Sequence, residues 1–422
     1  MVIKHKVFKN AFIYTLTDVI NKAVPFLLLP IMTSYLSPED YGRVATYGAF
    51  TAIVAVFIHL SMVGAVSVNY FKVTKDQLKV YIANTLVIMS VSSVVVFLAI
   101  LIFDDRLSTL IDIPWLWLCV GVIVTVAQFL TMLNLGLWQL EQKPKAFGSY
   151  QIVQMLTNTS LVLALVIGFE MGWEGSLIGQ AIATILFSLI SFGFIYKRGY
   201  LSFHVNKADI KDALRFGVPL IPYALSGWFR TGVDRMMLTS FIGASATGLY
   251  SVGYQFGLII GVITVAFNQA YSPFLYKKLE NIDEQGKRKQ VKFTYLYFIG
   301  ILILAGILSV IVPYIIQNFL NERYHASSQI VGWVLYGYAF QGMYFMVVIY
   351  IFYTKRTYIL SAIAFFTGLL HVGISYYLIK LNGIIGAAQA TTISFFIMFL
   401  LAWLLSSRIY SMPWGLKVKH GK

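Results

Sequence analysis

The chain has 422 residues, of which 59% are hydrophobic and 12% charged, and its formal net charge is +15. Soluble domains contain roughly 45–50% apolar and about 25% charged residues, so this composition excludes an ordinary soluble fold and predicts an all-α polytopic membrane protein. A single cysteine, Cys119, excludes an internal disulfide framework and a cysteine-based metal cluster.

Apolar segments long enough to cross a bilayer, which takes about 20 residues, recur along the chain. The first follows the basic sequence MVIKHKVFKN, lacks a small-residue cleavage site, and is expected to remain as a permanent span. The sequence predicts twelve spans, near residues 10–36, 43–70, 79–103, 115–139, 147–169, 175–196, 214–242, 247–272, 292–317, 327–353, 357–379 and 384–407.

The loops between these spans predict the orientation of the protein. Of the 32 Lys and Arg residues, 25 fall on the side of the N-terminus and four on the opposite side. Basic loops face the cytoplasm, so both termini are predicted to be cytoplasmic. The outer loops are too short for a soluble domain, and no Walker loop or HExxH spacing occurs. We therefore expect a transporter rather than an enzyme, with no cofactor, no metal and no nucleic-acid partner.

The two halves of the chain resemble each other at three places. Thr33, Ser34 and Gly42 match Thr239, Ser240 and Gly248 at a shift of 206; Gly172-x-x-Gly175 matches Gly383-x-x-Gly386 at 211; and the turn 142–145 matches 354–357 at 212. This repeat predicts two six-helix bundles, residues 1–200 and 201–422, related by a pseudo-two-fold axis along the membrane normal. Transporters with such repeats bind substrate between the halves.

Five ionisable residues fall inside the predicted spans: Asp18, Lys22, Arg230, Asp234 and Arg235. A charge at the centre of a span costs roughly 2.5–3.5 kcal/mol on insertion scales, and such residues usually face a cavity or the protein interior. The set is net basic and lies on spans one and seven, which are equivalent in the repeat. It predicts a cationic central cavity suited to phosphate, which Arg binds through two parallel N–H groups.

The candidate roles follow from this interpretation. Lys22, Arg230 and Arg235 are candidate substrate-binding residues, and Trp228 is a candidate for stacking on a sugar ring. Asp18 and Asp234 are candidates for binding the coupling ion. Two alternatives stay open: the i,i+4 pairs can be buried ion pairs that hold helices in register, and Arg235 can extend outward to the membrane surface.

Proline and glycine give further signals. Pro25 and Pro30 in the first span, and Pro219 and Pro222 in the seventh, remove backbone hydrogen bonds and bend helices, so they are candidate gating positions. The stripe Gly253-x3-Gly257-x3-Gly261 in the eighth span is interpreted as a close helix contact in preference to a gate.

Three stretches carry a family resemblance: FKNAFIYTLTDVINKAVPFLLLPIMTSYLSPEDYG, VDRMMLTSFIGASATGLYSVGYQFG and GIIGAAQATTISF. They resemble Wzx-type O-antigen flippases, the polysaccharide transport family of the multidrug/oligosaccharidyl-lipid/polysaccharide exporter superfamily. The resemblance implies a V-shaped pair of six-helix bundles around a central cavity in the bacterial cytoplasmic membrane. It also implies that an oligosaccharide linked to undecaprenyl pyrophosphate is flipped to the outer leaflet by alternating access, with H⁺ or Na⁺ coupling. A polysaccharide polymerase and a chain-length regulator of the same pathway are the protein partners it suggests.

The alternative is a multidrug-type cation/proton antiporter of the same superfamily. A cavity for drug cations should be acidic, whereas the charges inside these spans are net basic, which favours the flippase. A membrane enzyme of polysaccharide assembly is disfavoured because no large outer loop is present.

Overall fold

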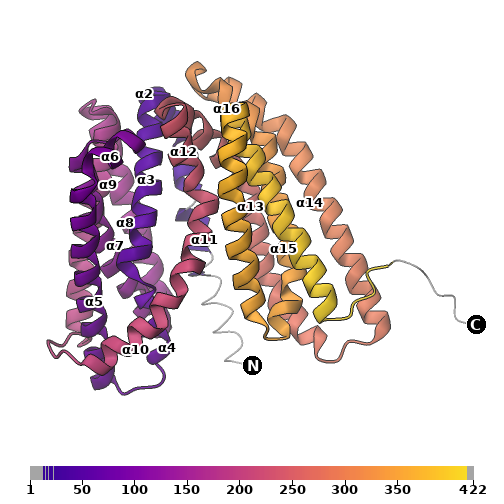
Figure 1. Ribbon diagram of the computed structural model, residues 1–422, viewed down its shortest axis with the longest axis horizontal. Helices are drawn as coiled ribbons and strands as arrows, with labels where there is room; N and C mark the ends of the chain where they lie inside the picture. The colour runs from indigo at the N-terminus through magenta and orange to yellow at the C-terminus, as the bar shows by residue number, and fades with distance from the viewer. Residues whose placement is uncertain (1–12, 15, 18, 22, 416–422) are drawn as a thin grey trace, which may run out of the picture. The chain divides into compact units, whose positions relative to one another are not determined.

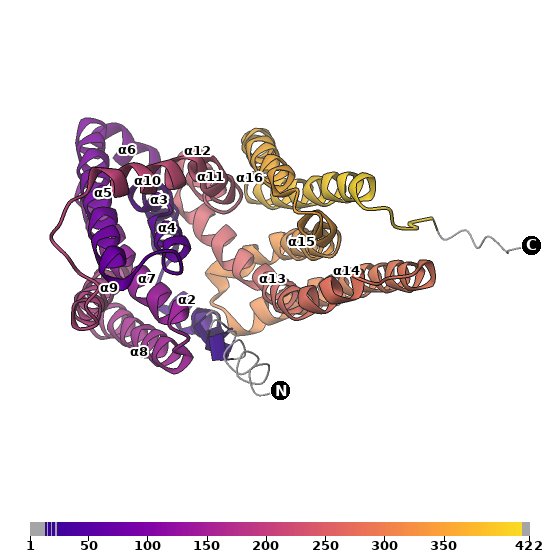
Figure 2. The ribbon, with the colours of Figure 1, turned by 90° about the horizontal axis from the view of Figure 1, so that it is seen from below.

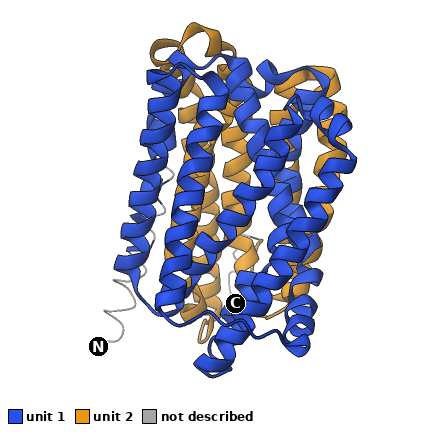
Figure 3. Ribbon diagram, turned by 90° about the vertical axis from the view of Figure 1, so that its left-hand side faces the viewer, with its two compact units in different colours: residues 1–248 blue, residues 249–422 orange. Residues whose placement is uncertain are grey.

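The computed structural model describes residues 13–415 except 15, 18 and 22, and its regular elements are all helical within that part of the chain (Figure 1). The chain divides into two compact units, residues 1–248 and residues 249–422 (Figure 3). The prediction of an all-helical chain is confirmed for the described residues.

The first unit contains the helices up to the start of α13. Helical residues before Leu28 lead into α2. The elements are α2 (Leu29–Tyr35), α3 (Pro38–His59), α4 (Met62–Asn69), α5 (Lys75–Ile102), α6 (Asp104–Ile111), α7 (Trp115–Leu140), α8 (Pro144–Leu163), the π-helical turn η1 (Ala164–Gly168), α9 (Gly172–Lys197), α10 (Lys207–Gly217), the 3₁₀ turn η2 (Val218–Leu220), α11 (Ile221–Thr231) and α12 (Val233–Phe241).

The second unit is built from four long helices and one short 3₁₀ element. These are α13 (Ala244–Leu279), whose first turn belongs to the first unit, α14 (Glu284–Phe319), η3 (Glu322–Ser327), α15 (Ser328–Tyr353) and α16 (Thr357–Ile409). α15 packs against both α14 and α16.

Nine helices among the described residues are long and apolar enough to cross a membrane. The longest, α16, covers two predicted spans and is bent at Gly383, whose φ of 59° and ψ of −131° are not helical. The sequence placed the turn between spans eleven and twelve at this glycine. The prediction of a multi-pass membrane protein is therefore confirmed.

The second predicted span, residues 43–70, is not continuous. α3 ends at His59 and α4 starts at Met62, and between them Leu60 and Ser61 have left-handed backbone with φ of 44° and 56°. Gly217 at the end of α10 packs so closely here that a Cβ would lie 2.0 Å from the backbone oxygen of Leu60. The continuous span was a wrong prediction: its helix ends at His59, and a segment distant in the sequence packs against the break.

The core of the first unit lies around α3, α5 and α7. Its buried residues include Phe50, Ile58, Ile82, Leu118 and Phe129. α9 packs against both α7 and α8 (Figure 2). The segment after residue 200 also packs here: α10 contacts α4 and α5, and α11 and α12 contact α3. The compact units thus follow packing and divide at residue 248, whereas the predicted boundary at residue 200 follows the sequence repeat.

The glycine stripe of α13 packs against α15 within the second unit. A Cβ at Gly257 would lie 2.2 Å from Val334, and those at Gly253 and Gly261 would meet Ile330 and Tyr338. The facing residues on α15 are four positions apart, as the glycines are. The interpretation of this stripe as a close helix contact is confirmed.

The repeat seen in the sequence is also present in the local backbone. Gly172 and Gly383 both have positive φ, 56° and 59°. Gly175 and Gly386 both approach a backbone carbonyl, that of Leu165 or Leu378. Positions at which only glycine fits without strain or a clash therefore recur at the predicted shift of 211.

Candidate functional site

The segment predicted as one seventh span, residues 214–242, is interrupted twice. α10 stops at Gly217, and α11 and α12 are separated at Gly232. Pro219 lies within η2 and Pro222 in the first turn of α11, where a missing backbone N–H is tolerated. Pro219 and Pro222 thus lie where one helical element ends and the next begins, whereas the second interruption, at Gly232, contains no proline.

The first two candidate gating prolines have a similar arrangement. Pro30 lies in the first turn of α2, directly after a turn at Leu28, and Pro25 lies in the helical residues before that turn. Their gating role stays a prediction.

Four predicted site residues lie on α11 and α12. Trp228 and Arg230 are near the end of α11 and are half-buried, and Asp234 and Arg235 are in the first turn of α12. Asp234 is only 1% exposed. The guanidinium of Arg235 donates to the backbone carbonyl of Thr231. The expected i,i+4 face shared by Arg230 and Asp234 assumed a regular helix, and the helix is interrupted between them.

The other two charged candidates, Asp18 and Lys22, lie outside the described residues. Their predicted roles therefore stay predictions.

Trp228 anchors the interrupted segment to α3. Its Nε1–H donates to the backbone oxygen of Ala49 at 2.8 Å. The indole also packs on Gly232, where a Cβ would lie 2.3 Å from Nε1. The tryptophan N–H is thus satisfied within the first unit, as a partly buried indole requires.

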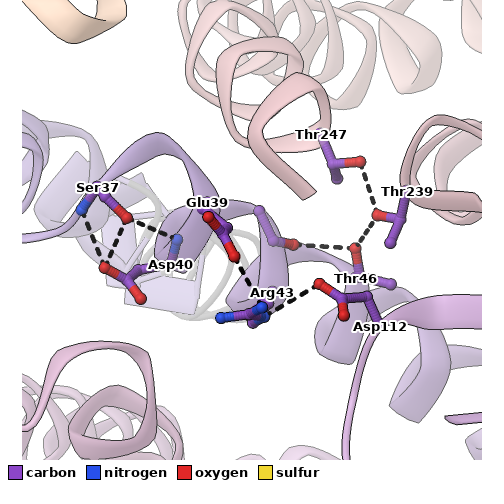
Figure 4. Close-up of polar contacts among 9 residues, drawn as sticks. Ser37, Glu39, Asp40, Arg43, Thr46, Asp112, Thr239 and Thr247 are labelled. Atoms are coloured by element: carbon purple, nitrogen blue, oxygen red, sulfur yellow. Dashed lines mark hydrogen bonds and ion pairs between the residues drawn. The ribbon is translucent and has the colours of Figure 1, made fainter. Parts of the chain in front are cut away.

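Three threonine hydroxyls connect α3, α12 and the first turn of α13 (Figure 4). Thr46 Oγ1 lies 2.6 Å from Thr239 Oγ1, which lies 2.7 Å from Thr247 Oγ1. Thr46 also donates to the carbonyl of Gly42, and Thr247 to that of Arg235. Three hydroxyl protons serve four contacts, so one contact is always without a proton. The threonine chain reaches the backbone of a candidate site residue.

The start of α3 carries a second polar group (Figure 4). Ser37 and Asp40 form a reciprocal capping box, with the hydroxyl of Ser37 accepting from the backbone N–H of Asp40. Arg43 pairs with Glu39 at 2.7 Å and with Asp112 at 3.1 Å. These contacts fix the N-terminus of the helix that holds Thr46.

The repeated glycines Gly42 and Gly248 contact each other's segments directly. A Cβ at Gly42 would lie 1.8 Å from the backbone oxygen of Ala244, and a Cβ at Gly248 would lie 1.8 Å from that of Pro38. Both glycines and both carbonyls are separated by 206 positions in the sequence. The contact is reciprocal, as contacts between two-fold-related segments are, and it leaves room for no side chain.

A partly buried ion cluster lies at the turn between α7 and α8. Glu141 accepts from Tyr200 at 2.8 Å and from Arg198 at 3.3 Å, and it pairs with Lys143 at 2.8 Å. The side chains of Glu141 and Arg198 are 11% and 15% exposed. Burial raises the pKa of Glu141, but Lys143, Tyr200 and Arg198 outweigh it, so this pKa lies below its usual value. By its sequence position Arg198 is one of the 25 basic residues on the side of the N-terminus, and only the fold pairs it with Glu141.

Sequence reasoning also missed a polar cavity in the first unit, between α8, α9 and the helical residues before α2. Gln151, Gln154 and Asn158 of α8 line it. Their i, i+3, i+7 spacing places them on one helix face, and this was the signal in the sequence. They were overlooked because only the fold brings Asn21 and Gln180 beside them.

Comparison with known proteins decides the family. Residues 7–279 match the family described as polysaccharide biosynthesis protein. The chain belongs to this family. The resemblance drawn from the sequence motifs is thereby confirmed at the level of the family.

Two relatives of this polysaccharide biosynthesis protein match over nearly their whole length. The "Lsg locus putative protein 1" of Haemophilus influenzae is 23% identical and covers 93% of this chain and 98% of its own. The "Capsular polysaccharide biosynthesis protein CapF" of Staphylococcus aureus is 24% identical and covers 95% and 100%.

Solved structures share the fold of this family member. The lipid II flippase MurJ in an inward closed conformation has a TM-score of 0.75 at 15% identity, covering 93% of this chain and 87% of that chain. An inward-facing multidrug resistance transporter of the MATE family has a TM-score of 0.68 at 13% identity, covering 92% and 94%. At these identities the likeness establishes the fold alone.

Proposed function

We propose that this protein is a flippase for a surface polysaccharide. It moves an oligosaccharide linked to undecaprenyl pyrophosphate from the inner to the outer leaflet of the bacterial cytoplasmic membrane. The observation that carries the proposal is the family match over residues 7–279. A full-length relative whose name assigns it to capsular polysaccharide biosynthesis supports it, and so does a fold shared with a lipid II flippase.

The mechanism we propose is alternating access by two six-helix bundles in twelve spans, with both termini in the cytoplasm. Nine described helices have the length and composition of a span, and α16 contains two predicted spans joined at Gly383. The interrupted pair α11 and α12 and the helical residues that lead into α2 supply the remaining two.

The binding roles follow from charge. Lys22, Arg230 and Arg235 contact the pyrophosphate, because its oxygens accept charge-assisted hydrogen bonds that compensate for leaving water. Trp228 stacks on a sugar ring of the glycan.

The coupling roles follow from the two carboxylates inside the spans. Asp18 and Asp234 bind the coupling ion, H⁺ or Na⁺. The burial of Asp234 inside a predicted span supports this role, because ionisable residues within membrane spans commonly mark ion pathways. The interruptions beside Pro25, Pro30, Pro219 and Pro222 supply the bends at which the helices move.

A multidrug/proton antiporter remains the alternative function. It has the same fold, so the fold does not separate the two. The family match and the net basic set of intramembrane charges favour the glycan substrate.

The direct test removes the protein from its own host. We expect cells without it to lose the surface polymer and to accumulate the lipid-linked repeat unit on the inner leaflet. Complementation with Arg230→Ala/Arg235→Ala, expressed at the wild-type level in the membrane, should restore little polymer. Normal polymer in the deletion strain, together with increased sensitivity to cationic drugs, would instead support the antiporter.

A further inference from the structure

The polar cavity of the first unit has a volume of about 340 Å³. Carboxamides dominate its lining: Asn21 precedes α2, Gln151, Gln154 and Asn158 come from α8, and Gln180 comes from α9 beside Thr184. α8 and α9 are both candidate membrane spans. Five amides therefore converge on one hollow at membrane depth, where polar groups are costly and usually functional.

Two of the five amides, Gln154 and Asn158, do not hold described parts of the protein together. Asn21 donates from Nδ2 to Oε1 of Gln151 at 3.3 Å, but its own Oδ1 is buried with no hydrogen-bond partner. Gln154 and Asn158 make no side-chain hydrogen bond to any described residue. The buried Oδ1 of Asn21 has no partner, which is destabilising, and the partly buried amides of Gln154 and Asn158 keep donors and acceptors available to a ligand.

A structural role in helix association explains only part of this pattern. Amides that join membrane helices do so by hydrogen bonds across the helix interface. Asn21 with Gln151 is the one such bond that the cavity's described amides make, and Gln180 bonds only to Ser176 of its own helix, at 3.2 Å. The convergence of Gln154, Asn158 and Gln180 is left unexplained by helix association.

The chemistry of the lining selects a class of ligand. Each carboxamide offers two donors and an acceptor on adjacent atoms, which matches neighbouring sugar hydroxyls that both donate and accept. None of the described lining residues is charged, whereas a phosphate site would use Arg or Lys. The volume lies at the lower end of the range of roughly 300–1,000 Å³ for small-molecule sites, which suits a short stretch of sugar rings.

We infer that this carboxamide cavity binds uncharged sugar rings of the transported glycan and sets which glycan the protein accepts. The inference rests on the proposed function for its choice of a lipid-linked glycan. It separates two tasks: the cationic residues of spans one and seven bind the pyrophosphate, and the amides of α8 and α9 bind the sugar.

The test measures binding to the full-length protein in lipid nanodiscs, so that no sugar-headed detergent competes. The probe is the neutral oligosaccharide released by mild acid from the lipid-linked pool of the host cells and treated with phosphatase. Calorimetric titration compares wild type with Gln154→Met/Asn158→Leu, which keeps side-chain size and removes both amides. Asn318→Leu is the control, because Asn318 is an exposed amide of α14 that bonds to Tyr314 of its own helix.

We expect the double variant to bind the oligosaccharide roughly 10- to 100-fold more weakly, from two lost hydrogen-bonding groups, while the control binds as wild type does. Inorganic pyrophosphate should bind wild type and double variant equally. If the double variant is poorly folded, Thr184→Val gives a milder test, with a severalfold loss expected.

Equal oligosaccharide affinity in wild type and a folded cavity variant would overturn the inference, as would a wild-type protein that does not bind this probe. The proposed function fails separately, if deletion of the protein leaves the surface polymer unchanged. A protein that binds the sugar through these amides without being needed for export would refute the flippase and keep the cavity assignment.

Discussion

The contact between Gly42 and the first turn of α13 allows a sharp stability prediction. Gly42→Ala places a Cβ 1.8 Å from the backbone oxygen of Ala244, where an ordinary contact begins near 3.4 Å. Relief requires α3 and the start of α13 to separate by roughly 1.6 Å. Both partners are backbone, so no side chain can rotate away.

The magnitude follows from two opposing effects. Overpacking a close contact costs about 1–3 kcal/mol, whereas alanine gains about 1 kcal/mol over glycine in a helix interior. Gly48 calibrates the second effect, because it lies on the same helix and a Cβ added there would meet nothing within 4 Å. The difference between Gly42→Ala and Gly48→Ala therefore isolates the overpacking.

The assay is thermal unfolding of the purified protein by tryptophan fluorescence, with all variants scanned at one rate because unfolding of such proteins is commonly irreversible. At about 2–4 °C per kcal/mol, Gly42→Ala should unfold several degrees below Gly48→Ala. Gly248→Ala should behave like Gly42→Ala. The double variant should lose less than the sum, since one separation of the helices relieves both overlaps.

A Gly42→Ala protein as stable as Gly48→Ala would refute this account of the contact between α3 and the first turn of α13. So would strictly additive losses in the double variant.

Two further predictions concern polar groups. Glu141→Gln should destabilise the first unit by about 1–3 kcal/mol at pH 7, because it weakens the hydrogen bonds and charge pairing of Arg198, Tyr200 and Lys143. The folded-state pKa of Glu141 is lowered, so its stabilisation is present above the unfolded-state value of about 4.3 and is lost as pH falls through the folded-state pKa. Unfolding curves of wild type and variant should thus converge in acid, and a constant difference from pH 7 to pH 3 would contradict the sign. Thr239→Val should cost only about 1 kcal/mol, because Thr46 and Thr247 can still donate to the carbonyls of Gly42 and Arg235; a loss several times larger in the same thermal assay would show that the hydroxyl chain acts as a unit.

The sequence was sufficient for the features that depend on local composition. Hydropathy predicted the helices, and glycine predicted the bend at Gly383 and the packing stripe on α13. The sequence was also sufficient for the repeat. Gly42 and Gly248 lie at a backbone contact where any side chain would clash, so glycine marks both positions. Such features depend on the identity of particular residues, which the sequence gives directly.

The features that were missed depend on contacts between distant segments. The interruption after His59 accompanies the approach of Gly217, and the one at Gly232 accompanies the packing of Trp228, which hydrogen-bonds to α3. Hydropathy is averaged over a window of residues, so a break of one or two residues inside an apolar segment does not show in it. Arg198 was counted among loop charges because its partner Glu141 is 57 residues away. The cavity amides were overlooked because only the fold brings α8 and α9 together around them.

The most direct test of the central claim is transport by the purified protein. Proteoliposomes would carry a fluorescent undecaprenyl-pyrophosphate-linked oligosaccharide, and a membrane-impermeant reagent would quench the fraction in the outer leaflet over time. The account predicts that wild-type protein exposes the inner-leaflet fraction to the reagent and that Arg230→Ala/Arg235→Ala does so far more slowly. Exposure no faster than in protein-free liposomes, across an imposed H⁺ or Na⁺ gradient of either direction, would contradict it.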